Sequence, residues 1–278
     1  MRAIDLRHLG NEKVMGCWEV DGVLIDPGPQ STEATLLEAL DGAVPSAVLL
    51  THIHFDHAGA AGALVRRWPE LPVYVHERGA PHLASPERLV ASAARLWGGE
   101  EGLARLWGEV VPVPEANLNV LSGGETVLGD YRVEYTPGHA SHHVAYLHEP
   151  TGTAFVGDVA GVRIPPSEYV MIPTPPPDID LEAWDRSIAL VEGWAPQALA
   201  LAHFGRVDDV GPHLAAARER LHEVIRLAAQ HGPEAFEAGI LDRIGQHAGE
   251  LIDTYVQAAP VDQIYLGARR YLDKRAQG

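Results

Sequence analysis

The chain has 278 residues, of which 46% are hydrophobic and 21% are charged. This composition is typical of a well-packed globular protein and excludes a wholly disordered chain. Lys and Arg total 21 against 38 Asp and Glu, so the formal charge is −17 at pH 7. Such an acidic chain, without any basic run, argues against nucleic acid and anionic membrane surfaces as partners.

The compartment and redox context follow from what the chain lacks. No apolar run approaches the roughly 20 residues that a membrane-spanning helix needs. The first residues, from Met1 to Asp5, do not form the apolar core of a signal peptide. Cys17 is the only cysteine, so no intrachain disulfide can form, and we assign it no catalytic role. We therefore expect a cytoplasmic protein.

Apolar periodicity and turn residues predict a succession of short strands and helices in the first part of the chain. The expected elements are a hairpin, a helix, a buried strand, an Ala-rich helix and a further strand, at Val14–Val20 with Gly22–Ile25, Ser31–Leu40, Ser46–Leu50, Ala58–Trp68 and Val73–His76. A helical stretch at Pro81–Glu109 is expected to form a cap over the site. Four more strands are expected, at Arg132–Tyr135, Val144–His148, Ala154–Val156 and Ala198–Ala202.

The last third of the chain changes character. The Pro-rich segment Ile164–Asp178 is incompatible with a helix or a central strand. Beyond it, helical spacing recurs at Pro212–Gln230, Pro233–Ala258 and Val261–Arg275. We predict a catalytic domain over residues 1–206 and an all-helical subdomain over residues 207–278. Its apolar helices are expected to shape the substrate pocket or to form a homodimer contact.

The densest group of metal-capable side chains lies between Thr51 and His57, in the sequence Thr-His-Ile-His-Phe-Asp-His. His52 and His54 are two residues apart, so on an extended segment they point the same way. Asp56 and His57 need a turn to reach a second centre. Imidazole and carboxylate together favour Zn²⁺, Fe or Mn²⁺ over Ca²⁺. The alternative is a surface cluster that binds nothing.

Three further candidate ligands follow predicted strands. His139 occurs in Thr-Pro-Gly-His, Asp158 in Val-Gly-Asp-Val, and His203 in Ala-His-Phe-Gly. Open sheets place ligand sites at strand ends, so these residues are candidates to complete the shells that one cluster cannot close alone.

The motif His52-x-His54-x-Asp56-His57, followed by His139, Asp158 and His203, resembles the metallo-β-lactamase superfamily, particularly its glyoxalase II-like and lactonase-like branches. The resemblance covers residues 10–205 and implies an α/β fold, a four-layer αββα sandwich with metals at one edge. It also implies that His52, His54 and His139 hold one ion. Asp56, His57 and His203 would hold the other, with Asp158 bridging the two.

The roles of several further residues have two possible interpretations. Asp26 either orients a ligand histidine or simply forms the turn before Pro27-Gly28. One of His142 and His143 either contacts substrate or supports the metal ligands from behind; alternatively, one packs while the other is solvated. Tyr169 contacts the substrate carbonyl, as a tyrosine does in the lactonase-like branch, or packs on the sheet.

The predicted function is a binuclear, zinc-type metallohydrolase. A hydroxide shared by two divalent ions would attack a thioester, lactone or other ester carbonyl, and Asp56 would orient it. No Gly-x-Ser-x-Gly elbow suggests a serine nucleophile. The C-terminal third lacks evident Lys and Arg residues that would bind a glutathione carboxylate, which disfavours a glutathione thioester as the substrate. The alternatives are a mononuclear Fe(II) persulfide dioxygenase and a non-catalytic metal-binding scaffold.

Overall fold

The computed structural model describes residues 1–277, and its strands form two six-stranded sheets. The first sheet has the order β1-β2-β3-β4-β5-β6, with bounds Arg2–Asp5, Gly16–Val20, Val23–Ile25, Ala47–Leu49, Val73–His76 and Leu118–Leu121. The second has the order β12-β11-β10-β9-β8-β7, and β7 to β12 span Thr126–Val127, Tyr131–Tyr135, Val144–His148, Thr153–Phe155, Ala198–Leu201 and Gly205–Val207.

Helices surround this pair of sheets. In chain order, α1 to α7 span Glu33–Leu40, Phe55–Ala58, Ala61–Arg67, Ala80–Ala84, Glu87–Ala94, Gly99–Trp107 and Leu181–Gly193. At the C-terminal end, α8 to α11 span Val210–Gln230, Pro233–Ala248, Ile252–Ala258 and Val261–Gln277. Short 3₁₀ turns occupy His8–Gly10, Gln30–Thr32, Glu115–Asn117 and Gly249–Leu251.

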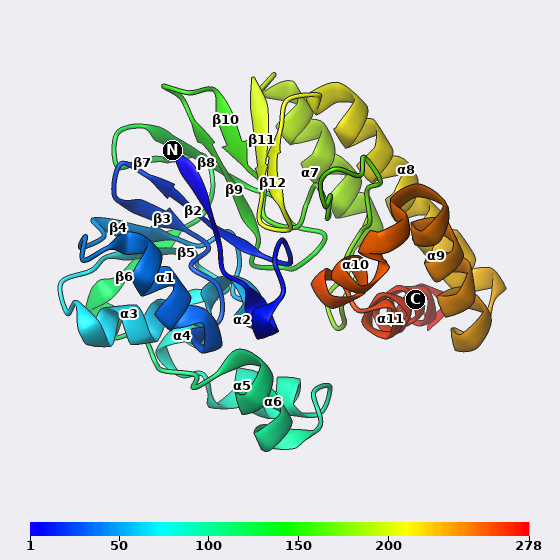
Figure 1. Ribbon diagram of the computed structural model, residues 1–278, viewed down its shortest axis with the longest axis horizontal. Coiled ribbons are helices and arrows are strands. Elements are labelled where there is room, and N and C mark those ends of the chain that lie inside the picture. Colours follow the sequence, from blue (N-terminus) through cyan, green and yellow to red (C-terminus); the bar gives the residue numbers. More distant parts are fainter. Residues whose placement is uncertain (278) are drawn as a thin grey trace.

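The alternation of side chains along each strand explains the layers. In β3, Val23 and Ile25 belong to an inner core shared with Phe155 of the second sheet, whereas Leu24 belongs to the larger core under the helices. Successive residues of a strand face opposite sides, so each sheet buries one face on the other sheet and one on helices. The predicted α/β sandwich is confirmed, with α1 and α3 beside the first sheet and α7 beside the second (Figure 1).

The sequence located most elements but misjudged some of their limits. Glycine at 249 interrupts the single helix expected over 233–258, and a 3₁₀ turn separates α9 from α10 there. The expected cap over 81–109 consists of α4, α5 and α6 rather than one helix. Sequence analysis missed β1, β6, β7 and β12, because short edge strands carry little periodicity. It also missed α7, although Asp180 caps its N-terminus by accepting a hydrogen bond from the backbone N–H of Ala183 and was an available signal.

The C-terminal helices share their core with the rest of the chain. Leu214, Leu221 and Ile264 are fully buried and belong to the same apolar core as Leu199 of the second sheet. In Figure 1, α8 lies beside α7, and α9, α10 and α11 gather next to it. Of the apolar side chains from α9 to α10, Phe236, Ile240, Ile244 and Tyr255 are buried within this chain, whereas Leu241, Leu251, Ile252 and Val256 are partly buried. The homodimer contact stays a prediction.

In the described part of the chain, no helix combines the length and apolarity required to cross a bilayer.

A core substitution in α8 tests whether the helices and sheets unfold together. Leu221 is 0% exposed, and we expect Leu221→Ala to destabilise the whole protein by about 2–5 kcal/mol through the cavity it leaves. Calorimetry should show one transition at a lower temperature. Leu266→Ala, at a position 45% exposed on α11, is the matched control and should change stability little. Two separate transitions would contradict a shared core.

Candidate metal centre

The loop after β4 supplies four of the candidate ligands, as the sequence predicted. His52 and His54 lie on an extended segment, and His54 is the residue before the first turn of α2. Asp56 and His57 belong to α2 itself. The change from extended to helical backbone turns the last two side chains away from the direction of the first two, which is how one short segment serves two groups of ligands.

The first group consists of His52, His54 and His139. The Nε2 atom of His52 lies 3.0 Å from Nδ1 of His54, and Nε2 of His139 lies 3.1 Å from the same Nδ1. Nitrogens bound to a tetrahedral zinc ion at 2.0–2.1 Å are about 3.3 Å apart. Burial lowers the pKa of His54 to about 3, so this ring is neutral and offers a lone pair.

The second group consists of Asp56, His57 and His203. Oδ2 of Asp56 lies 3.6 Å from Nε2 of His57 and 3.5 Å from Nε2 of His203. Burial raises the pKa of the Asp56 carboxyl, but His57 and His203 outweigh it and lower that pKa overall. The carboxylate is therefore ionised at neutral pH.

Asp158 lies between the two groups. Its Oδ2 atom is 3.3 Å from Nε2 of His139. Its Oδ1 atom is 3.4 Å from Nε2 of His57 and 3.7 Å from Nε2 of His203. One oxygen therefore faces each group, so that a single carboxylate can contribute to both.

Hydrogen bonds on the outer side of the rings fix which nitrogen carries the proton. His139 Nδ1 donates to the carbonyl of Pro173 at 3.0 Å, and His203 Nδ1 donates to that of Val14 at 2.7 Å. His57 Nδ1 donates to Oδ2 of Asp26 at 2.9 Å. Burial lowers the pKa of His57 and of His203, but Asp158 and Asp56 outweigh it and raise both pKa values overall, so these two rings also attract a proton at the inner Nε2. A bound cation takes the place of that proton, and the neutral ring then offers its Nε2 lone pair to the ion.

The inner atoms fit a cation because they have no other partner. His57 Nε2, Asp158 Oδ1 and His203 Nε2 are buried and make no hydrogen bond within the described residues. The buried carboxylates beside these atoms must be matched by positive charge, which either protons on His57 and His203 or a bound metal ion can supply. The donor set, imidazole with carboxylate, suits first-row transition metals.

Asp26 supports the loop as well as His57. Its Oδ1 accepts from the backbone N–H of Thr51 at 2.8 Å, and its Oδ2 accepts from the Thr51 hydroxyl at 2.6 Å. The Thr51 hydroxyl oxygen in turn accepts from Nδ1 of His52 at 3.1 Å. The geometry matches the ligand-orienting reading of Asp26, which is also a turn residue at φ 51°. Sequence analysis missed Thr51, whose position just before the histidine cluster was the available signal.

Two glycines in the predicted motifs are required by close packing. A Cβ at Gly157 would lie 2.5 Å from Oγ1 of Thr51 and 2.6 Å from Nε2 of His143. A Cβ at Gly138 would lie 2.3 Å from the backbone of Trp184. Each glycine also has a positive φ, 47° at residue 157 and 134° at residue 138. Both therefore let the chain deliver the next residue, a candidate ligand, into the centre.

The remaining candidates take different places. His143 is buried beneath the ligands, where its Nε2 accepts from the backbone N–H of Asp158 at 3.3 Å and its Nδ1 bonds the Thr136 hydroxyl at 2.8 Å. His142 lines the cavity beside the site. Tyr169 stacks on His247 at 5.4 Å and is absent from the described wall of that cavity. Its position thus gives a substrate contact no support, and the ring packs against His247 and Tyr255 of the C-terminal helices rather than on the sheet.

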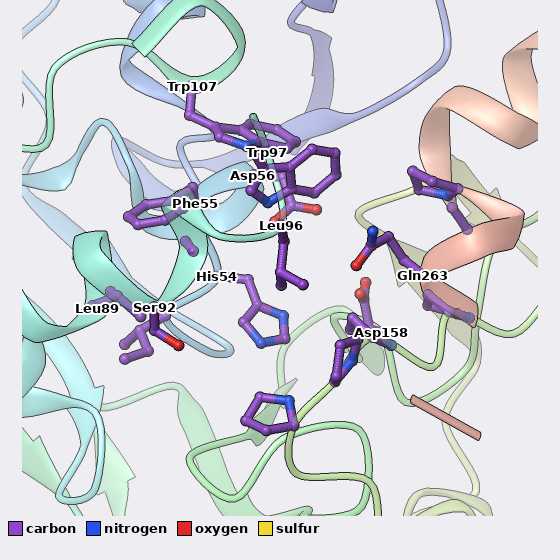
Figure 2. Close-up of a pocket in the computed structure, with 18 of the residues that line it drawn as sticks. His54, Phe55, Asp56, Leu89, Ser92, Leu96, Trp97, Trp107, Asp158 and Gln263 are labelled. Atoms are coloured by element: carbon purple, nitrogen blue, oxygen red, sulfur yellow. The ribbon is translucent and has the colours of Figure 1, made fainter. Parts of the chain in front are cut away.

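A cavity of about 440 Å³ opens onto the candidate ligands. Figure 2 shows His54, Asp56 and Asp158 around it, with Leu96 and Trp97 on another side. Much of the wall is apolar, and it includes residues of the expected cap helices α5 and α6. The C-terminal subdomain contributes a part that consists of Gln257, Ala258, Ala259, Pro260, Gln263 and Ile264. These helices therefore line the cavity beside the candidate ligands, and their role in a substrate pocket stays a prediction.

Comparison with known proteins identifies the family. A family model described as the Metallo-beta-lactamase superfamily matches residues 20–199. The match covers more than half of the chain and includes all the candidate ligands except His203. The chain belongs to the metallo-β-lactamase superfamily, as its motif predicted.

Relatives at about the same level of identity come from several organisms. A metallo-beta-lactamase fold-containing protein of Sulfurisphaera tokodaii, ST1585, is 31% identical over 200 residues, which cover 69% of this chain and 71% of that protein. The probable metallo-hydrolase YqgX of Bacillus subtilis is 31% identical over 49% of this chain and 60% of its own. A hydroxyacylglutathione hydrolase of Xylella fastidiosa is 31% identical over 53% of this chain, but the match spans only 45% of that enzyme.

Solved structures agree with the fold. The archaeal ST1585 structure, from Sulfolobus tokodaii, aligns with a TM-score of 0.65 at 24% identity and covers 81% of this chain and 85% of that one. TTHA1623, solved in a di-iron-bound form, aligns with a TM-score of 0.54 at 28% identity and covers 71% of this chain and 90% of that one.

Removal of the Asp26 carboxylate tests its role behind the metal ligands. Because Asp26 orients His57 and holds Thr51, we expect Asp26→Asn to weaken metal binding by about 10–100-fold, the usual range for such outer partners. Competition with a chromogenic chelator measures the affinity. Asp130→Asn, at an exposed position, is the control and should bind metal as the unaltered protein does. Equal affinity of both variants would contradict this role.

Proposed function

We propose that this chain is a binuclear metal-dependent hydrolase that cleaves an acyl carbonyl compound, such as a thioester, lactone or other ester. The observation that carries the proposal is the convergence of seven candidate ligands in one buried cluster with Asp158 between its two halves, at the base of a cavity. The ligand groups within reach of one another are His52 with His54 and His139, His52 with His57 and Asp158, and Asp56 with His57 and His203.

Side chains and backbone carbonyls of this chain would orient the attacking water, accept its proton and position the ligand rings. Bound divalent ions lower the pKa of water toward neutrality and polarise a carbonyl oxygen. Asp56 is ionised and lines the cavity, where its carboxylate can orient a water molecule and accept its proton. Three ligand rings, those of His57, His139 and His203, are held in orientation by the hydrogen bonds described above to Asp26, Pro173 and Val14. The apolar wall limits the access of bulk water to the carbonyl.

The cavity favours a small acyl substrate over nucleic acid or glutathione. Its arginines, Arg78 and Arg88, come from the N-terminal part, and the described C-terminal residues in the wall carry no basic side chain. The C-terminal part of the wall therefore offers no basic side chain that could bind the carboxylates of glutathione, in keeping with the sequence-based expectation. With a net charge of −17, the chain also repels phosphate backbones.

The two other functions predicted as alternatives are less well supported. A mononuclear Fe(II) persulfide dioxygenase would leave Asp56, His57 and His203 without a role, yet their side chains converge on one another. A metal-binding scaffold without catalysis needs no apolar cavity above its ligands, and here the cavity reaches His54 and Asp158.

The number of bound ions is the first test. We expect close to two equivalents of transition metal per chain in protein prepared without chelator and reconstituted with Zn²⁺, Fe²⁺ or Mn²⁺. Zinc is our first choice from the ligand set, and iron is a second because TTHA1623 was solved in a di-iron form. Elemental analysis by mass spectrometry measures the ratio. One iron would favour the dioxygenase, and none would rule out the proposal.

Substitution of Asp56 tests the hydrolytic mechanism. We expect Asp56→Ala to lower kcat/KM by at least about 100-fold, because a proton acceptor and a ligand are lost together. The assay is a panel of thioester, lactone, phosphodiester and β-lactam substrates with metal-loaded protein. His57→Ala should behave similarly and lose part of its metal. Asp253→Ala, at an exposed position on α10, is the control and should retain full turnover. Retained turnover in Asp56→Ala would contradict the assignment.

A further inference from the structure

Gln263 of α11 is a polar side chain in the cavity wall that the proposed mechanism does not use. The residue is 7% exposed and lies on the first turns of the last helix. Figure 2 shows its carboxamide directed into the cavity, on the side of Asp158. No motif marks this position in the sequence, where it is one glutamine within an amphipathic helix.

The hydrogen bonds of Gln263 fix which end of its carboxamide is free. Nε2 lies 3.2 Å from Oδ2 of Asp262, an acceptor, so the amide nitrogen is the group that faces Asp262. Oε1 is buried and has no hydrogen-bond partner within the described residues. A buried acceptor without a donor is destabilising and uncommon in folded proteins. The terminal torsion of glutamine is soft, so the carboxamide can turn toward a ligand without movement of α11.

The second glutamine of the wall shows the contrast. Gln257 Nε2 donates to the carbonyl of His8 at 2.9 Å, and its Oε1 accepts from Nδ2 of Asn11 at 2.6 Å. Its hydrogen bonds hold the C-terminal subdomain to the N-terminal turn. Both glutamines line the cavity, but only Gln263 has an oxygen left over for a ligand.

In contrast to the polar Gln263, the wall formed by α5, α6 and the turn between them is apolar. It presents Leu89, Leu96, Trp97 and Trp107, and Trp97 packs edge-on against Trp107 with ring centroids 5.3 Å apart. Leu96 is 38% exposed in a chain whose other large apolar residues are mostly buried. Such a surface is stabilised by an apolar group that covers it.

We propose that Gln263 is a substrate-positioning residue, whose Oε1 accepts a hydrogen bond from an N–H or O–H group of a substrate with an apolar tail on the α5–α6 wall. The inference rests on the proposed function for the identity of the reacting carbonyl. It narrows the substrate class to acyl compounds that carry a hydrogen-bond donor beside the scissile carbonyl and an alkyl or aryl chain beyond it. An N-acylated ester, thioester or lactone has this arrangement.

The test measures binding, so that it does not depend on turnover. N-octanoylglycine has the amide N–H, and 4-oxoundecanoic acid replaces that N–H by a methylene group while the chain and carboxylate stay the same, and neither compound is an ester. Isothermal titration calorimetry on the metal-loaded protein gives the ratio of their dissociation constants. We expect the amide to bind about tenfold more tightly, the ratio that one buried hydrogen bond produces.

Two variants assign the preference to one residue. Gln263→Leu should bring the ratio close to one, whereas Gln257→Leu, the matched control, should keep it near tenfold even if the protein is less stable. A merely structural role of Gln263 would weaken both ligands equally and leave the ratio unchanged. Thermal unfolding of each variant shows whether it is folded.

The outcomes separate this inference from the proposed function. A ratio near one in the unaltered protein, a ratio that survives Gln263→Leu, or no measurable binding of either ligand would each overturn the role of Gln263. Absence of hydrolysis together with a Gln263-dependent ratio would overturn the proposed function instead and leave the binding site standing.

Discussion

The buried carboxylate of Asp158 is the group on which the arrangement of this protein depends. It lies between two sets of imidazoles, with one oxygen toward His139 and the other toward His57 and His203. A carboxylate in a site without bulk water must be matched by positive charge. The outer nitrogens of three rings donate to backbone carbonyls or to Asp26, so their inner nitrogens face the carboxylate. Positive charge at these inner nitrogens, from a proton on His57 or His203 or from a bound cation, meets the requirement.

The two sheets make this convergence possible, because they bring ligands from distant parts of the chain to one edge. The loop after β4 of the first sheet supplies the histidine cluster, and segments after β8, β10 and β11 of the second supply His139, Asp158 and His203. Two of these segments have a glycine directly before the candidate ligand. Gly138 and Gly157 pass so close to neighbouring atoms that a side chain would displace the ligand that follows. Close packing at these two glycines therefore helps to place His139 and Asp158 at the site.

The C-terminal helices extend the site beyond its metal ligands. They share one apolar core with the sheets, so their position relative to the ligands is fixed by packing rather than by a flexible linker. Through this contact α11 places Gln263 in a cavity whose other wall comes from α5 and α6. The candidate ligands thus come from the sheet edges, whereas the added helices form part of the cavity wall.

The sequence by itself determined the superfamily and most strands, and it indicated the candidate ligand set, because candidate ligands are short-range signals: His52 to His57 are adjacent, and His139, Asp158 and His203 each follow an apolar run. It also indicated that the C-terminal helices must cover apolar surface. Only the tertiary structure decided that Thr51 and Asp26 hold the loop, that Tyr169 packs away from the cavity, and that Gln263 faces it. Those facts depend on contacts between side chains that are 25 to 100 or more residues apart in the chain. Periodicity predicts which face of a helix is apolar, but it does not predict which element packs against that face.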